Sequence, residues 1–475
     1  MTGASDPGGS DESDPVPSNG SDPVPSNGSD PVPSRRSVLA ACGAGMAALA
    51  GCSSVGIGTS DGGEERRYDA DRLAEIGRRD LPARPVAFPV AVTDEMIGRH
   101  RDRARELLAD VPETPSVPNG VVTRRLRDLR DEVVEALEPE ANGEDVSGPT
   151  TPLDRLDRAR GVRADAAEFV SAYRAATGNL DPGNIEEGRN DLRSAVTAFE
   201  ADWEYRGTDP ASALVVHEEL ETLVGIARRN AEASPPVPGT PIAEVFEVGE
   251  IVHDLENGRG SLEDANRLRE RYLAETPDPR SFRSTFTVAA DRLHRPGLVR
   301  TERIHEYVEA GPDDLPFERS LDGTPALQLF DDARRELRFN RTNASGAREQ
   351  REYATAVIAG GRTIASVRAF ETVIDAIEAG KYERPETVDR VATEREGAVA
   401  ALSDAWETSP ATLSVELAEP AFDALRSGHW HLDRGGESAH DVDEVFASFA
   451  FAKYLAEVVP DVLDTTLRTL ENARG

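Results

Sequence analysis

The sequence predicts an all-α fold made of two antiparallel helical bundles, which follow a disordered signal and tether. Apolar residues recur every three or four positions from about residue 92 onward, which is the period of an amphipathic helix. Strand-like alternation bounded by turns is rare. Matching segments also recur in the same order at a spacing of about two hundred residues, which suggests an internal duplication.

The clearest helix follows Thr151 and Pro152, which supply an N-terminal cap and a first-turn proline, and it stops at Gly178. Similar apolar stripes run through residues 388–406 and 445–467. Segments rich in proline or glycine separate the helical stretches and have lengths that suit helix–helix loops. They are Pro112–Pro118, Glu138–Pro152, Ser234–Pro241, Glu275–Pro279 and Gly311–Pro325.

The duplication is visible in two pairs of segments. Ala198–Glu204 resembles Ala401–Glu407, and Glu244–Phe246 matches Glu444–Phe446. The segments of the first pair have similar surroundings. A helix-ending glycine precedes each of them, Gly178 in the first half and Gly380 in the second. A cap-like dipeptide follows each of them, Asp209–Pro210 and Ser409–Pro410. We therefore predict two related bundles over residues 91–277 and 278–475, with Trp203 and Trp406 as equivalent core anchors.

The charge balance is strongly acidic, with 88 acidic residues against 54 basic ones and a formal net charge of -34. Nearly all the cations are arginine, since Lys381 and Lys453 are the only lysines. This composition resembles that of proteins from extreme halophiles, whose carboxylate surface stays hydrated where salt screens charge within ~3 Å. It weighs against nucleic acid as a partner, because nucleic-acid binding needs a basic face.

The N-terminal region contains features of an export and lipidation signal. Residues 1–34 are low-complexity and are predicted to be disordered. Ser34–Leu39, with Arg35 and Arg36, resembles the twin-arginine export motif, and a short, weakly apolar stretch leads to a lipobox-like end at Cys52. The resemblance implies a cleaved signal over residues 1–51, a lipid on Cys52 and attachment to the outer face of the cell membrane through the export machinery.

Cys42 also ends a lipobox-like segment, but it follows the arginines too closely to leave an apolar stretch, so Cys52 is preferred. These two are the only cysteines, and the mature chain is therefore expected to have no disulfide and no cysteine nucleophile. Residues 52–90 are predicted to form a flexible tether.

The densest group of metal-ligand side chains is His429, His431 and His440 with nearby carboxylates, in what looks like a glycine-rich loop. Imidazole nitrogens and carboxylates suit zinc, copper or iron, so a transition metal is the cofactor this group would hold. Alternatively, these residues are a solvated polar loop.

A second candidate is His253 with Glu256, three residues apart on one predicted helix face. This pair resembles the His-x-x-Glu motif of imelysin-like surface proteins, although Gly249 lies four residues before the histidine rather than two. The resemblance implies metal binding at His253 and Glu256. A surface ion pair is the alternative, and the aligned position in the second half is Lys453.

Two adjacent glycosylation acceptor triplets begin at Asn340 and Asn343. An exported protein would present them to the glycosylation machinery, so both asparagines are predicted as candidate modification sites.

Phosphate loops, nucleophile elbows, zinc-protease helices, calcium loops and cysteine-pair metal sites are not found in the sequence. The sequence therefore favours a non-enzymatic binding or scaffold module at the cell surface, whose ligand it does not identify. The alternative is an imelysin-like protein that captures a metal or haem.

The lipobox-like segment predicts which substitution would remove the lipid anchor. Replacing Cys52 by Ser should leave folding and export intact but release the protein from the membrane fraction into the medium, because the lipid is its only predicted attachment. Cys42→Ser is the matched control and should stay membrane-bound. Membrane retention of Cys52→Ser together with release of Cys42→Ser would show that the upstream cysteine carries the lipid.

Overall fold

The computed structural model describes residues 68–138, 151–232, 241–311, 314–433 and 438–474, and it confirms the all-α prediction. The strands within these residues are two short ones, β1 (Arg206–Gly207) and β2 (Arg280–Ser281), which pair antiparallel. The export and lipidation residues Arg35, Arg36 and Cys52 lie outside the described residues. No helix in the described ranges is both long enough and apolar enough to cross a bilayer.

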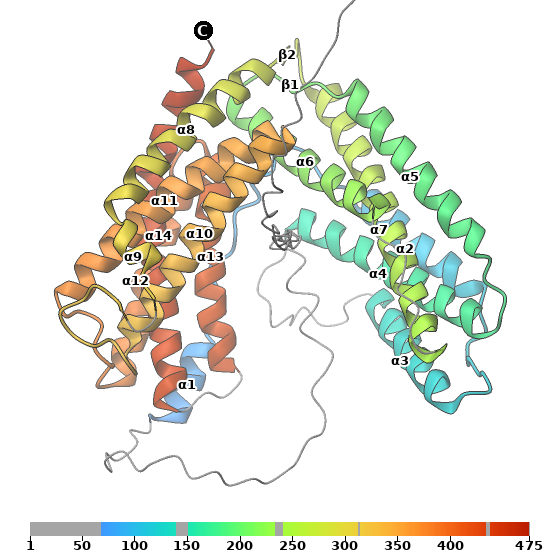
Figure 1. The fold of residues 1–475 in the computed structure, drawn as a ribbon, viewed down its shortest axis with the longest axis horizontal. Helices are drawn as coiled ribbons and strands as arrows, with labels where there is room; N and C mark the ends of the chain where they lie inside the picture. The colour runs from blue at the N-terminus through green and yellow to red at the C-terminus, as the bar shows by residue number, and fades with distance from the viewer. Residues whose placement is uncertain (1–67, 139–150, 233–240, 312–313, 434–437, 475) are drawn as a thin grey trace, which may run out of the picture. The chain divides into compact units, whose positions relative to one another are not determined.

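The described residues of the first half form six helices: α2 (Asp94–Ala109), α3 (Gly120–Leu137), α4 (Pro152–Ala176), α5 (Pro182–Asp202), α6 (Pro210–Glu232) and α7 (Pro241–Glu275). Helix α4 packs against α2, α3 and α7, and α6 packs against α5 and α7 (Figure 1). The predicted start of α4 is confirmed, because Thr151 and Asp154 form a capping box and Pro152 opens the helix. Buried Leu156, Leu192 and Leu220 contribute to the core.

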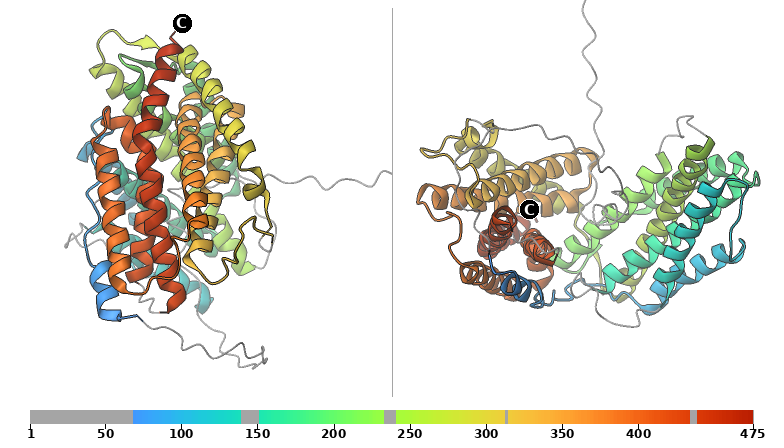
Figure 2. Two further views of the ribbon diagram at one scale, coloured as in Figure 1. Left: turned by 90° about the vertical axis from the view of Figure 1, so that its left-hand side faces the viewer. Right: turned by 90° about the horizontal axis from the view of Figure 1, so that it is seen from below.

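In the second half, seven helices lie within the residues that the structure describes: α8 (Arg283–Arg303), α9 (His305–Glu309), α10 (Pro325–Gln350), α11 (Tyr353–Glu378), α12 (Val388–Glu407), α13 (Ala411–Asp433) and α14 (Ala439–Asn472). Helices α11 and α14 are central, since α11 contacts α8, α10 and α14, while α14 also contacts α12 and α13 (Figure 2). Fully buried Phe370 and Phe449 lie on these two helices.

The order and pairing of helices correspond between the halves, as a duplication requires. Helix α4 packs on α7 as α11 packs on α14, and α6 packs on α5 and α7 as α13 packs on α12 and α14. Gly178 and Gly380 end α4 and α11 with left-handed φ angles of 72° and 74°, which glycine adopts without steric cost. Trp203 contacts His217 on the following helix, and Trp406 contacts Phe422 on its following helix.

Residues 68–90 are not a tether, and that part of the prediction is wrong. Helix α1 (Ala70–Gly77) packs on α12 and α13 of the second half, with Leu73 and Ile76 buried. The Tyr68 hydroxyl donates to the Pro385 carbonyl at 2.8 Å. The helix is short, and its few apolar residues do not repeat often enough to show a helical period in the sequence. The sequence alone therefore does not separate this segment from the polar stretch before it.

A buried carboxylate connects the two halves. Glu221 on α6 accepts hydrogen bonds from the backbone N–H groups of Ala354 (3.0 Å) and Thr355 (2.6 Å), and from the Tyr205 hydroxyl (2.6 Å). Glu221 therefore caps the first turn of α11, whose N–H groups have no acceptor within their own helix. Next to it, Phe282 donates its backbone N–H to the Tyr205 carbonyl at 2.6 Å.

Stability should depend on pH through Glu221. Burial raises the pKa of Glu221 to about 7, against the lowering effect of its hydrogen bonds. A carboxyl group with a raised folded-state pKa contributes stability below its unfolded pKa of about 4.5, and this contribution is lost as pH rises through about 7. The unfolding free energy of the wild type relative to Glu221→Gln should fall by up to about 3 kcal/mol from pH 4.5 to 8.

Denaturant unfolding of both proteins at constant high salt measures this difference. Glu232→Gln, at an exposed position on the same helix, is the control and should show no such trend. A difference between wild type and Glu221→Gln that stays flat across the same pH range would contradict the assignment.

Candidate metal-binding site

Helices α4 and α7 run antiparallel and are joined by buried ion pairs. Arg160 donates to Asp264 at 2.9 Å and Arg163 donates to Glu256 at 2.8 Å. His100 of α2 places Nε2 2.9 Å from the second oxygen of Asp264. All five side chains are buried, and each carboxylate has at least one cationic partner, as charges inside a protein require.

Two glycines let α7 approach α4 closely. A Cβ atom at Gly260 would lie 2.9 Å from Cγ of Arg160, and one at Gly249 would lie 3.1 Å from both Cγ and the carbonyl oxygen of Glu168. Any side chain at these positions would push the helices apart. Gly249 is one helical turn before His253, so the close approach brings that histidine to the surface of α4.

Asp165 and Glu168 lie one turn apart on α4, and His253 faces them from α7. One ligand atom from each residue lies within 4.8 Å of the other two. His253 Nε2 is 3.4 Å from Asp165 Oδ1. The side chains are 29% exposed for His253 and 51% for Asp165, so an ion held here would remain open to solvent on one side.

The other nitrogen of the His253 ring is also engaged, since Nδ1 lies 3.3 Å from Asp254 Oδ1. A carboxylate on the far nitrogen is the usual way to fix the orientation of a metal-binding imidazole. Burial alone would lower the pKa of His253, but hydrogen bonds to Asp165 and Asp254 and the charges of both outweigh it and raise the pKa to about 10. Burial raises the pKa of Glu168, and the charge of His253 opposes that shift.

This arrangement can act as a cation site in two states. Without a metal, protonated His253 is the cation that balances the surrounding carboxylates. A divalent ion would replace that proton and take one imidazole nitrogen and two carboxylate oxygens, a ligand set that suits zinc, manganese or iron. Water would complete the coordination on the exposed side.

Of the predicted metal-binding pair His253 and Glu256, the structure places only His253 in this cluster. Glu256 takes no part in the cluster, because it accepts from Arg163, from Arg103 Nε at 3.4 Å and from Arg259 at 3.3 Å. Sequence reasoning missed Asp165 and Glu168. Their one-turn spacing was visible, but acidic pairs are common in this chain, and only the packing of α7 on α4 shows which pair faces a histidine.

The three histidines of the other candidate group lie on helices rather than in a loop, which corrects the sequence interpretation. His429 and His431 belong to the last turns of α13, and His440 belongs to the first turn of α14. His429 is buried, whereas His440 has a side chain that is 79% exposed. Positions two apart on a helix point in nearly opposite directions, so His429 and His431 cannot face the same ion.

The partners of these histidines also differ. His429 Nε2 accepts from Arg395 Nε at 2.7 Å, and burial together with the charge of Arg395 lowers the pKa of His429 to about 4. His431 and His440 both approach the carboxylate of Glu444, at 3.5 and 3.3 Å. The structure therefore does not bring the three together as ligands of one metal.

The two glycosylation candidates lie on helix α10. Asn340 is 1% exposed and donates to Glu336 at 2.7 Å and to the Ser366 hydroxyl at 2.8 Å. A glycan on Asn340 is incompatible with this packing, so the prediction for Asn340 is wrong. Asn343 is half-buried and its modification remains a prediction.

Two family models match the chain, one in each half. Residues 95–278 are similar to a domain of unknown function (DUF8262), and residues 280–468 are similar to another (DUF8264). The two matches meet at residue 279, close to the predicted boundary between the bundles. No curated protein and no solved structure matches the chain.

The buried ion pairs of α4 and α7 predict a large effect for one arginine. Arg160→Met should lower the free energy of unfolding by about 3 kcal/mol, because it leaves buried Asp264 with His100 at 2.9 Å and only a distant ion pair, to Arg267 at 4.0 Å. Arg99→Met removes a solvent-exposed ion pair with Glu95 and should therefore lower the free energy of unfolding far less. Denaturant unfolding at constant salt compares the two, and equal losses would show that the buried network is not what holds the helices together.

Proposed function

We propose that the mature chain is a lipid-anchored binding protein at the outer face of the cell membrane, and that its first half captures a divalent transition-metal ion. The proposal of metal capture rests on the cluster of Asp165, Glu168 and His253, because three ligand atoms from two helices lie within 4.8 Å of one another. The export and lipobox motifs at Arg35, Arg36 and Cys52 support the location.

Capture, rather than catalysis, is the activity that this cluster supports best. Its ligands are partly exposed side chains of α4 and α7. The hollow that Arg163 of α4 and Glu256 of α7 help to line contains only arginines and carboxylates, which are held in ion pairs with each other or with neighbouring residues. Twin-arginine export carries folded proteins, so the ligands on α4 and α7 would already be assembled when the chain reaches the surface. A metal-free binding or scaffold role is the alternative, and the experiment below distinguishes the two.

The metal can be tested with the exported, mature chain purified from high salt. Equilibrium dialysis against Zn²⁺ or Mn²⁺ in molar KCl, followed by elemental analysis, should give one ion per chain. High salt suppresses loose binding of cations to the acidic surface. His253→Gln should weaken binding by at least about 100-fold, since it removes the only nitrogen ligand of the cluster.

Two further variants separate a built site from general acidity. Asp254→Asn should keep the stoichiometry but weaken binding by about 10- to 100-fold, because Asp254 orients the His253 ring without being a ligand. His440→Gln, at an exposed histidine of the second half, should change nothing. If the wild type and His253→Gln bind equally, the metal proposal fails and the scaffold role is left.

A further inference from the structure

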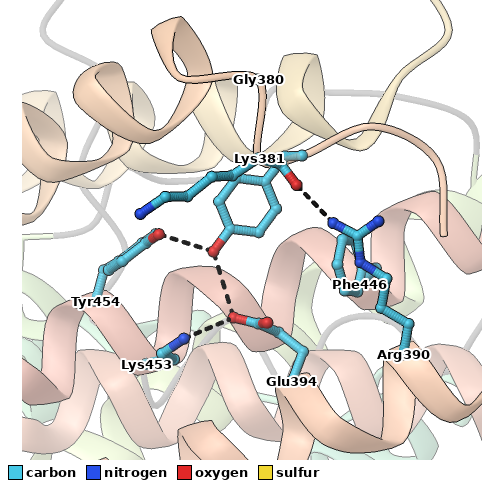
Figure 3. A pocket seen from close by; sticks show the side chains of 8 residues that line it. Gly380, Lys381, Arg390, Glu394, Phe446, Lys453 and Tyr454 are labelled. Atoms are coloured by element: carbon cyan, nitrogen blue, oxygen red, sulfur yellow. Dashed lines mark hydrogen bonds and ion pairs between the residues drawn. The ribbon is translucent and has the colours of Figure 1, made fainter.

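The second half has a hollow of about 310 Å³ between three segments that are distant in sequence. The loop after α11, helix α12 and helix α14 each contribute side chains to it (Figure 3). We call it the lysine hollow, and it is lined by Gly380, Lys381, Tyr382, Arg390, Glu394, Phe446, Lys453 and Tyr454.

The distribution of lysine singles out this place. The chain has 54 basic residues, yet its only two lysines, Lys381 and Lys453, both line this one hollow. They come from different elements and are brought together by the packing of the α11–α12 loop over α14. An ammonium group differs from a guanidinium group in being compact and in reaching an anion as a point charge from a flexible stem.

The cations of the hollow are not fully neutralised by protein groups. Lys453 Nζ lies 3.3 Å from Glu394 Oε1, and Glu457, outside the lining, also acts on its charge. Arg390 donates to the Lys381 carbonyl at 2.7 Å, and no carboxylate among the described residues pairs with its charge. Among the described residues, the Lys381 ammonium has no acceptor partner. Three cations therefore face one lining carboxylate, in a chain whose net charge is -34.

The rest of the lining is aromatic and able to donate hydrogen bonds. The Tyr382 hydroxyl lies 2.9 Å from the Tyr454 hydroxyl and 3.3 Å from Glu394 Oε1. Burial raises the pKa of both tyrosines, so their hydroxyls stay protonated at neutral pH. The Arg390 guanidinium lies over the Phe446 ring, 5.4 Å from its centre. Such a surface offers an apolar floor beside the cations.

We propose that the lysine hollow binds a small organic anion, with a carboxylate or phosphate group held by Lys381, Lys453 and Arg390 and an aromatic or apolar body against Tyr382 and Phe446. Lys381 supplies the free charge, Lys453 is held in place by Glu394, and Arg390 is braced by the Lys381 carbonyl and by Phe446. This site is independent of the metal cluster, which lies on α4 and α7 of the other half.

The scarcity of lysine makes a direct test possible. Reductive ¹³C-methylation of the mature chain keeps the lysine charge and gives one dimethyl-lysine NMR signal each for Lys381 and Lys453, assigned with the Lys381→Arg and Lys453→Arg variants. Titration with phenyl phosphate or benzoate at constant KCl should move both signals with a common midpoint. Separate midpoints, or signals that do not move, would overturn the proposal.

Affinity measurements on variants locate the charge. Lys381→Ala should weaken phenyl phosphate binding by roughly tenfold, the size of one charge-assisted contact, and Lys381→Arg should recover part of the loss. Lys381 is exposed and its side chain has no partner in the part of the chain that the structure describes, so the Ala variant is expected to fold. Arg468→Ala, which removes one cation from the exposed end of α14, is the control and should have no effect.

Two outcomes would count against parts of the assignment. An equal loss in Lys381→Ala and Arg468→Ala would mean that the anions respond to overall charge, which overturns the site. Inorganic phosphate that binds as tightly as phenyl phosphate would overturn the role given to Tyr382 and Phe446.

Discussion

The register of α7 on α4 is the constraint on which the first half depends. A buried carboxylate is costly without a cationic partner, and α7 buries two of them, Glu256 and Asp264. Their arginines lie one turn apart on α4, so sliding α7 along α4 would separate Arg160 from Asp264 and Arg163 from Glu256. The positions of the three cluster residues depend on the same register, because His253 of α7 faces Asp165 and Glu168 of α4 only in this alignment of the two helices.

In the second half, α11 packs on α14 as α4 packs on α7, but this contact is mainly apolar instead of being built on buried ion pairs. Gly361 of α11 lies where a Cβ atom would meet Leu417 at 2.9 Å and Thr466 at 3.2 Å. The ion pair from α11 to α14, Arg368 with Asp461 at 3.5 Å, uses a carboxylate that is 86% exposed. In the sequence match between the halves, His253 on α7 corresponds to Lys453 on α14. The same point of a repeated helix would thus serve the proposed cation cluster in one half and the proposed anion site in the other. We infer that the repeated scaffold fixes where a site forms, while local side chains decide the sign of the charge that it accepts.

Local features of the fold were predictable and tertiary ones were not. Helix starts and stops depend on residues close in sequence, so they could be predicted from the sequence. This holds for the start of α4 at Thr151 and Pro152 and for the helix-ending glycines Gly178 and Gly380. The role of His253 required knowing that α7 faces Asp165, which is 88 residues away. The same limit applies to α1, which looks polar alone and becomes part of a core only against α12 and α13. The glycosylation prediction for Asn340 failed for a related reason, because an acceptor triplet in the sequence does not show whether its asparagine is buried in the fold.

Strong surface acidity changes how both sites must work. In dilute solution a net charge of -34 would concentrate cations everywhere on the surface and repel anions from Lys381 and Lys453. At molar salt the screening length falls to ~3 Å, so this general field vanishes while contacts at hydrogen-bond distance survive. Selection then depends on groups that touch the ligand. An imidazole braced by Asp254 favours a transition metal over the alkali cations of the medium, and an ammonium beside two aromatic rings favours an organic anion over chloride.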